Sequence, residues 1–128
     1  MQERAVNPSD GIYAATEDYV HAIELTGASR LLFVSGTMGL DQGGDAPQTL
    51  SEQLDLVWAN IGRILADAGM SAANIVRVTS YLRNSAFVGE NQEARVAALG
   101  DRRVPTTAIV VETLKEDWLV EIEVIAAA

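Results

Sequence analysis

Hydrophobic positions in the middle of the chain recur at helical spacing. Between residues 50 and 68 they occupy one side of an α-helix, and polar residues occupy the other. Thr49 and Glu52 match a capping box in front of this segment, and Gly69 follows it as a stop signal. The pattern therefore predicts a helix over residues 50–68. Its apolar side is formed by Leu50, Leu54, Val57, Ile61, Ile64, Leu65 and Ala68.

A second, weaker helix is predicted over residues 85–99. Ser85 can cap its start, and Gly100 ends it. Gly89 inside the segment costs about 1 kcal/mol relative to alanine, which weakens the pattern.

Segments rich in β-branched and aromatic residues predict strands around the two helices. Residues 26–30 have the composition of a hairpin loop between the first two strands, and the last two strands are joined by a turn. Residues 36–48 are rich in Gly and Asp, and a loop of this length is a candidate to line a site. The predicted strands cover 19–25, 31–35, 74–82, 106–114 and 119–127, with a short extra strand considered at 2–6.

The order β-β-α-β-α-β-β predicts an α+β fold in one domain over residues 1–128, with two helices packed on one face of a mixed sheet. The last strand alternates: Val120, Ile122, Val124 and Ala126 point to one face, and Leu119, Glu121, Glu123 and Ile125 point to the other. Because two helices cover only one face, we expect the second face to meet other subunits in a closed homo-oligomer.

The amino-acid composition argues against several kinds of site and partner. The chain has no cysteine and one histidine, so disulfides, a cysteine nucleophile and a thiolate or histidine-rich metal site are not predicted. Its net charge of −9 and the lack of a basic stripe speak against nucleic acid as a partner. No apolar run approaches the roughly 18 residues of a membrane span, and the N-terminus lacks the apolar core of a signal peptide. A cytoplasmic protein is expected.

Glu121 and Glu123 interrupt the apolar pattern of the last strand. They lie on one strand face with Cα atoms about 7 Å apart. A carboxylate held in a subunit cleft can act as a general base toward water. The plainer interpretation is a solvated acidic pair or ion pairs with nearby arginines, and spacing alone favours it. The candidate arginines are Arg77, Arg83, Arg102 and Arg103.

Three other features are weaker signals. Asn91 shares a helix face with Phe87, so its amide could orient a substrate or cap a neighbouring strand. His21 shares a strand face with Tyr19, and a lone strand histidine is usually structural. Gly36 belongs to the segment SGTMG, where glycine lets the backbone approach a ligand, but the spacing of a nucleotide-binding loop is absent.

Taken in order, four segments resemble the Rid family, also called YjgF/YER057c/UK114. The resemblance covers nearly the whole chain and rests on their combination. The segments are LLFVSGTMG, EQLDLVWANIGRILADAGMSAANIVRVTSYL, PTTAIVVETL and VEIEVIAAA.

This resemblance implies a chorismate-mutase-like fold that assembles as a homotrimer, with sheets lining a central barrel and sites between subunits. It implies a hydrolase of the enamine or imine deaminase kind, which converts reactive enamines and imines to a keto acid and ammonia without a cofactor. The expected partner is a small-molecule substrate.

The resemblance also implies site residues. The water-activating glutamate falls on Glu121, and the cleft tyrosine falls on Tyr19, where Glu17 and Asp18 replace the family's Gly-Pro. Backbone groups near Gly36 and Thr107 would stabilise developing charge. The residues expected to bind substrate are Ser35, Gly36, Thr37, Asn91 and Thr107.

Thr107 stands where RidA-type members carry a carboxylate-binding arginine, and Thr37 replaces the family's glutamine. A threonine offers one hydroxyl and no charge. The substrate is therefore expected to differ from a standard 2-imino acid, either by lacking the α-carboxylate or by having its acid placed elsewhere. As a hypothesis, Arg102 or Arg103, just before Pro105, binds the substrate carboxylate in place of the missing arginine.

Two other functions stay open at the level of sequence. A non-catalytic trimeric protein that binds or senses a small ligand would keep the cleft without the chemistry. A chaperone-like role through exposed apolar surface has no positive support. The older label of endoribonuclease, carried by some relatives, conflicts with the charge of −9.

Overall fold

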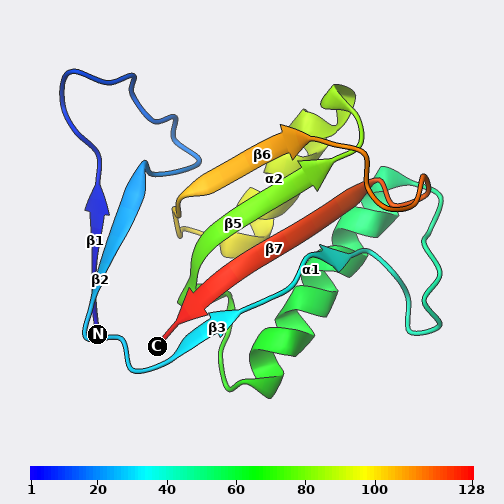
Figure 1. Cartoon of the computed structure of the whole chain (residues 1–128), viewed down its shortest axis with the longest axis horizontal. Helices are drawn as coiled ribbons and strands as arrows, with labels where there is room; N and C mark the ends of the chain where they lie inside the picture. Colours follow the sequence, from blue (N-terminus) through cyan, green and yellow to red (C-terminus); the bar gives the residue numbers. More distant parts are fainter.

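The computed structural model describes residues 1–128 and arranges them as an α+β fold (Figure 1). Two helices, α1 (Leu50–Asp67) and α2 (Val88–Leu99), are each accompanied by a short 3-10 turn, η1 (Ala72–Asn74) and η2 (Ser85–Phe87). The strands are β1 (Gln2–Val6), β2 (Ala22–Thr26), β3 (Leu31–Phe33), β4 (Thr37–Met38), β5 (Ile75–Leu82), β6 (Thr106–Val110) and β7 (Val120–Ala127).

Strand β7 lies in the middle of the main sheet although it follows all other strands in the sequence. The order is β3-β7-β5-β6, and β4 also pairs with β7 (Figure 1). The strands β3, β4 and β5 are antiparallel to β7, whereas β5 and β6 are parallel. A parallel pair needs a crossover connection, and α2 supplies it here.

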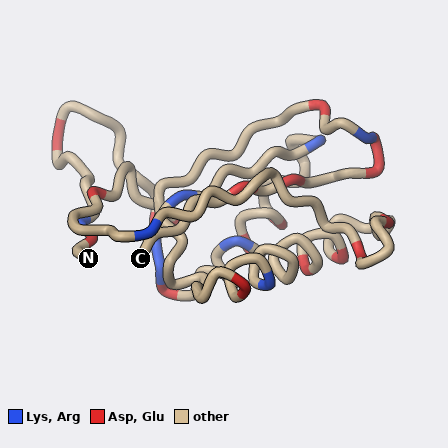
Figure 2. The backbone as a smooth tube through the Cα atoms, turned by 60° about the horizontal axis from the view of Figure 1, so that its bottom comes forward, with Lys and Arg blue, Asp and Glu red and all other residues tan.

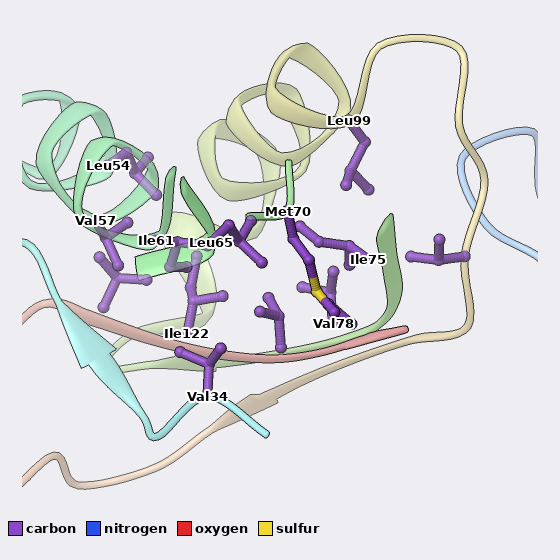
Figure 3. Packing of buried hydrophobic residues seen from close by; sticks show 14 of the residues in the cluster. Val34, Leu54, Val57, Ile61, Leu65, Met70, Ile75, Val78, Leu99 and Ile122 are labelled. Carbon is purple, nitrogen blue, oxygen red and sulfur yellow. The ribbon is translucent and has the colours of Figure 1, made fainter. Parts of the chain in front are cut away.

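Both helices cover the same face of this sheet (Figure 2). The apolar side of α1 packs with the inward residues of β7, and Figure 3 shows Val57, Ile61 and Ile122 in this core. The alternation predicted for the last strand is confirmed, since Val120, Ile122, Val124 and Ala126 are buried. The predicted cap of α1 is also present, because the Thr49 hydroxyl accepts a hydrogen bond from the backbone N–H of Glu52 at 3.2 Å.

The predicted hairpin between residues 19–25 and 31–35 is wrong. Strand β2 pairs with β1 as a separate two-stranded ribbon, which confirms the short strand considered at 2–6. After Gly27, whose φ is 73°, the chain turns toward the end of β7. There the backbone N–H groups of Ser29 and Arg30 both donate to the carbonyl of Ala128 at 2.9 Å. Strand β3 thus joins β7 and not β2.

Other predicted boundaries shift for local reasons. Tyr19 and His21 precede β2 and lie in the loop that connects it to β1. The start of the second helical segment is capped by Asn84, whose side chain accepts from the N–H of Ala86, and not by Ser85. The last two strands are joined by residues 111–119 but do not pair, because β5 separates them.

Polar contacts fasten the N-terminal ribbon and its loop to the rest of the chain. Arg95 of α2 forms an ion pair with Asp18 at 2.6 Å, and Arg102 forms one with Glu3 at 2.5 Å. The Nε of Arg103 donates to the carbonyl of Glu17 at 2.6 Å.

Neither helix combines the length and the apolar character that a membrane crossing requires.

Candidate functional site

The face of the main sheet opposite the helices is lined by polar residues with apolar residues at its margins. Strand alternation and register place these side chains on one face. Phe33 is 71% exposed and Ile109 is 50% exposed, so no part of this chain covers them. The residues of this open face are Leu31, Phe33, Arg77, Thr79, Tyr81, Thr107, Ile109, Glu121, Glu123 and Ile125.

Glu121 leans from β7 toward the segment that links β3 and β4. A Cβ added to Gly36 would lie 2.9 Å from Cδ of Glu121 and nearer still to its Oε2. Only glycine therefore leaves room for this carboxylate. The structure brings the predicted residues Glu121 and Gly36 together, and Ser35 precedes Gly36 as an exposed residue.

Glu123, two residues further along β7, has a different environment. Its Oε1 accepts a hydrogen bond from the Tyr81 hydroxyl at 2.5 Å. This hydrogen bond, followed by burial and the charge of the carboxylate, raises the pKa of Tyr81 above its usual value. Glu121 accepts no side-chain hydrogen bond, and none of the three ion pairs includes either glutamate. Glu121 is thus the free carboxylate of the pair.

Thr107 lies at the opposite edge of the open face, on β6. Its hydroxyl accepts a hydrogen bond from Nη2 of Arg77 at 2.8 Å. Arg77 belongs to β5, two residues before Thr79, which is the register partner of Thr107. Sequence reasoning considered Arg77 only as an ion-pair partner of the glutamates. Its place on the same strand face as Tyr81, at a spacing of four residues, was the available signal.

The other predicted site residues are not brought to Glu121 within one chain. Thr37 is the register partner of the core residue Ile122, and its hydroxyl donates to the carbonyl of Ser35 at 2.9 Å. Asn91 is 2% exposed and lies on the inward side of α2, between this helix and the sheet face that the helices cover. Its Oδ1 has no hydrogen-bond partner. Tyr19 lies in the N-terminal loop, with its ring 5.9 Å from that of His21.

His21 has a local structural role. Its Nε2 lies 2.8 Å from the backbone carbonyl of Tyr13, to which an N–H there can donate. Its ring meets the rings of Tyr13 and Tyr19 edge to face. No cluster of three or more His, Asp or Glu side chains in the structure could hold a metal ion.

Arg102 and Arg103 are occupied away from Thr107. The guanidinium of Arg102 binds the carboxylate of Glu3, and its Nε donates to the carbonyl of Ile75 at 2.7 Å. Arg103 donates to the backbone carbonyls of Glu17 and Gly100. The cation beside Thr107 is Arg77.

Two hollows open on this face of the sheet. One, of about 270 Å³, includes Tyr81, Glu121 and Glu123 together with residues 111–114. The other, of about 180 Å³, is lined by Phe33, Arg77, Glu123 and their neighbours. The largest hollow, about 670 Å³, lies between the loop after β4 and α1, and it includes Gly36 but not Glu121. The free carboxylate of Glu121 lies on the open face, so this face is the candidate site.

The carboxylate of Glu121 and the guanidinium of Arg77 point to opposite edges of the sheet. Glu121 leans over Gly36, beside β4, and Arg77 leans over Thr107, on β6. Three strand spacings, about 14 Å, separate these edges. Within one chain, the two groups therefore lean away from each other.

Comparisons with known proteins agree on one family. The sequence profile described as Endoribonuclease L-PSP matches residues 11–128. A protein of the RutC family from Pyrococcus horikoshii is 31% identical over 101 residues, covering 77% of this chain and 80% of the relative. The Rid-family protein YyfB from Yersinia pestis has a similar structure, with a TM-score of 0.85, 27% identity and full coverage of both chains. RidA from an Antarctic Psychrobacter is also similar, with a TM-score of 0.73, 25% identity and coverage of 98% of this chain and 100% of that one.

Proposed function

The chain belongs to the Rid family, and from this premise we propose that it hydrolyses C–N double bonds, as an enamine or imine deaminase does. The observation that carries the proposal is the Glu121 carboxylate, held over Gly36 without a competing side-chain hydrogen bond. A free carboxylate beside a backbone that allows close approach is suited to activating water.

The imine reacts in its protonated form. Glu121 accepts a proton from water while the water oxygen attacks the imine carbon, and the π electrons of the C=N bond move to nitrogen, which gives a neutral carbinolamine. The Glu121 carboxyl then returns its proton to that nitrogen. The C–N bond breaks, its electron pair leaves with nitrogen as ammonia, and the hydroxyl proton passes to bulk water as the C=O bond forms. The products are a carbonyl compound and ammonia. An enamine enters the same route after a proton is added to its carbon. An imine carbon needs little activation, so positioning and one base supply most of the rate.

The site is completed by a second copy of the chain. In one chain, Glu121 and Arg77 belong to adjacent strands but lean apart, Glu121 toward Gly36 beside β4 and Arg77 toward Thr107 on β6. If the β4 side of a neighbouring copy packs against the β6 edge of the first copy, the neighbour's Glu121 and the first copy's Arg77–Thr107 pair would contact the same small ligand. The exposed apolar residues Leu31, Phe33 and Ile109 support burial of this face between copies. A closed trimer, the assembly that the family resemblance implies, satisfies this requirement.

Residue 107 itself cannot bind an acid through charge. The Thr107 hydroxyl already accepts from Arg77, so what it offers a ligand is a further neutral hydrogen bond. This neutral side chain is also the observation that favours a second candidate, a non-catalytic protein that binds a small ligand in the same cleft.

Ammonia release from freshly generated 2-iminopropionate tests the hydrolase. The wild type should release ammonia well above the buffer rate. Glu121→Gln, which keeps the shape and removes the base, should lower the rate by about 10²- to 10⁴-fold. Glu123→Gln is the matched control and should keep most of the activity. Equal rates for wild type and Glu121→Gln would contradict the mechanism. If nothing turns over while a small carbonyl compound still raises the melting temperature, the binding protein is the better account.

Solution mass tests the assembly. Light scattering should give the mass of a trimer, and Phe33→Glu should dissociate it by placing a charge on the apolar margin of the open face. A monomeric wild type would exclude the shared site.

A further inference from the structure

The arginines of this chain differ in what they bind. Arg4, Arg95 and Arg102 form ion pairs with carboxylates. Arg30 and Arg103 donate to backbone carbonyls. Arg83 donates to the hydroxyl and carbonyl of Thr113 in the loop that precedes β7. Arg77 has one side-chain partner, the neutral hydroxyl of Thr107. It is half-buried, and its charge has no counter-charge within ion-pair distance although the chain has 18 acidic residues.

Arg77 lies on the open face immediately after a β-bulge. From Arg77 to Leu82 the pairing of β5 with β7 is regular, so Arg77 shares the open face with Thr79 and Tyr81. The register shifts between Ile75 and Arg77, and Ile75 and Val76 are both buried. Bulges occur often beside active sites.

The contact with Thr107 orients the guanidinium without neutralising it. A guanidinium has five N–H donors, and the hydroxyl engages one of them at 2.8 Å. The remaining donors form a planar fork, whose geometry matches a carboxylate. Thr107 is exposed on β6, the outer strand of the sheet, so a ligand on the open face can reach the fork.

We propose that Arg77, oriented by Thr107, binds the carboxylate of a short 2-imino or 2-oxo acid. This inference rests on the proposed function, because it names the acid class of substrate for the same site. It departs from both expectations drawn from Thr107: the substrate keeps its α-carboxylate, and a residue of the neighbouring strand holds it. In a chain of charge −9, which repels anions in general, a cation without a counter-charge on the open face favours the binding of an acid there.

Binding can be measured without turnover, with pyruvate as the probe and methyl pyruvate as its uncharged ester. Calorimetric titration of the wild type should show that pyruvate binds more tightly than methyl pyruvate. Arg77→Met should weaken pyruvate binding by roughly 10- to 150-fold, the usual worth of a charge-assisted hydrogen bond, and leave methyl pyruvate unchanged. Arg77→Lys should restore part of the affinity, because it keeps the charge and loses the fork. Thr107→Val, which removes the orienting hydroxyl, should weaken pyruvate binding less than Arg77→Met does.

Two controls separate this inference from other outcomes. Glu121→Gln should bind pyruvate at least as tightly as the wild type, because it removes a negative charge from the shared site and keeps Arg77. A wild type that hydrolyses nothing but binds pyruvate through Arg77 would refute the hydrolase and keep the inference. Solution mass shows whether Arg77→Met still assembles. The inference is overturned if Arg77→Met binds pyruvate like the wild type, if the wild type does not distinguish pyruvate from its ester, or if the substitution only dissociates the oligomer because Arg77 pairs with a carboxylate of a second copy.

Discussion

The carboxylate of Glu121 lies over Gly36, and a side chain at position 36 would occupy the same space. The two residues are 85 positions apart in the sequence, and the pairing of β4 with β7 brings them together. The need for glycine here is one of space, because Gly36 is not among the residues with positive φ. The position of the Glu121 carboxylate therefore depends on glycine at position 36.

Gly36→Ala should impair activity far more than stability. The added Cβ meets the end of a flexible side chain, so Glu121 can rotate away at a cost below about 1 kcal/mol. Its carboxylate would then leave the position proposed for the activation of water. Urea denaturation should give a stability close to the wild type, and ammonia release should fall toward that of Glu121→Gln.

Gly39→Ala provides a matched structural control for this prediction. A Cβ at position 39 would lie 2.7 Å from the backbone C and Cα of Gln53 in α1, and backbone atoms cannot rotate away. We expect destabilisation of about 1–3 kcal/mol from overpacking. If both alanine variants lose stability equally, the account of Gly36 as a site residue is wrong.

Tyr81 should titrate above its ordinary pKa of 10.0 because its hydroxyl donates to Glu123. A raised pKa in the folded state means that this interaction stabilises the protein fully below pH 10 and is lost as the pH rises through the folded-state value. Glu123→Gln should lower the Tyr81 pKa toward normal. Ultraviolet titration of tyrosinate measures this, and Glu121→Gln should have a smaller effect because it acts only through its charge. An unchanged titration in Glu123→Gln would contradict the assignment.

Asp18 should make the protein sensitive to acid. Partial burial opposes its ionisation, but hydrogen bonds from Thr16 and Arg95 outweigh that effect and lower its pKa below 3.8. The pair with Arg95 therefore stabilises the fold above pH 3.8 and is lost as the pH falls through the folded-state pKa. Asp18→Asn should cost about 1–3 kcal/mol at neutral pH. Chemical denaturation at a series of pH values should show this cost shrinking in acid, and a constant cost would refute the linkage.

Gln53 should be one of the most sensitive polar positions. Its buried amide donates to the carbonyls of Pro47 and Asp117 at 2.8 and 2.7 Å, and its Oε1 accepts from the N–H of Leu119 at 2.9 Å. One side chain thus joins the loop after β4 to the loop before β7. Gln53→Leu leaves all three backbone groups unpaired, and we expect a loss of about 3–5 kcal/mol in urea denaturation.

Gln92→Leu, at an exposed position of α2, is the control for Gln53 and should change stability by less than about 0.5 kcal/mol. A similar loss in both variants would show that leucine at a glutamine position, and not the three hydrogen bonds, causes the effect.

Periodicity predicted the parts of the fold that depend on one face being buried. The helix predicted over residues 50–68 is observed as Leu50–Asp67, and the inward residues of β7 were identified because a strand alternates with a period of two. The uncovered sheet face followed from the same alternation. Placing Glu121 on that face required no knowledge of its partners.

The sequence did not predict which strands pair or what individual side chains contact. Whether β2 joins β1 or β3 depends on Ser29 and Arg30 binding the carbonyl of Ala128, a contact across the whole chain. Alternation alone places Arg77 on the face of Tyr81, but its contact with Thr107 depends on the parallel pairing of β5 with β6, which the residues of either strand do not indicate. The family resemblance placed Asn91 in the site; it is buried on the inward side of α2, and its role in the site stays a prediction.

The central position of β7 has a consequence for biosynthesis. The sheet joins β3 and β4 to β5 only through β7, which follows them all in the sequence. During translation, α1 can form early, but the strands made before residues 120–127 emerge have no central neighbour, and their apolar edges stay open. Pairing across such long sequence separations is slow. We therefore expect the nascent chain to depend on protection from aggregation until β7 inserts, and Glu121 reaches Gly36 at that same moment.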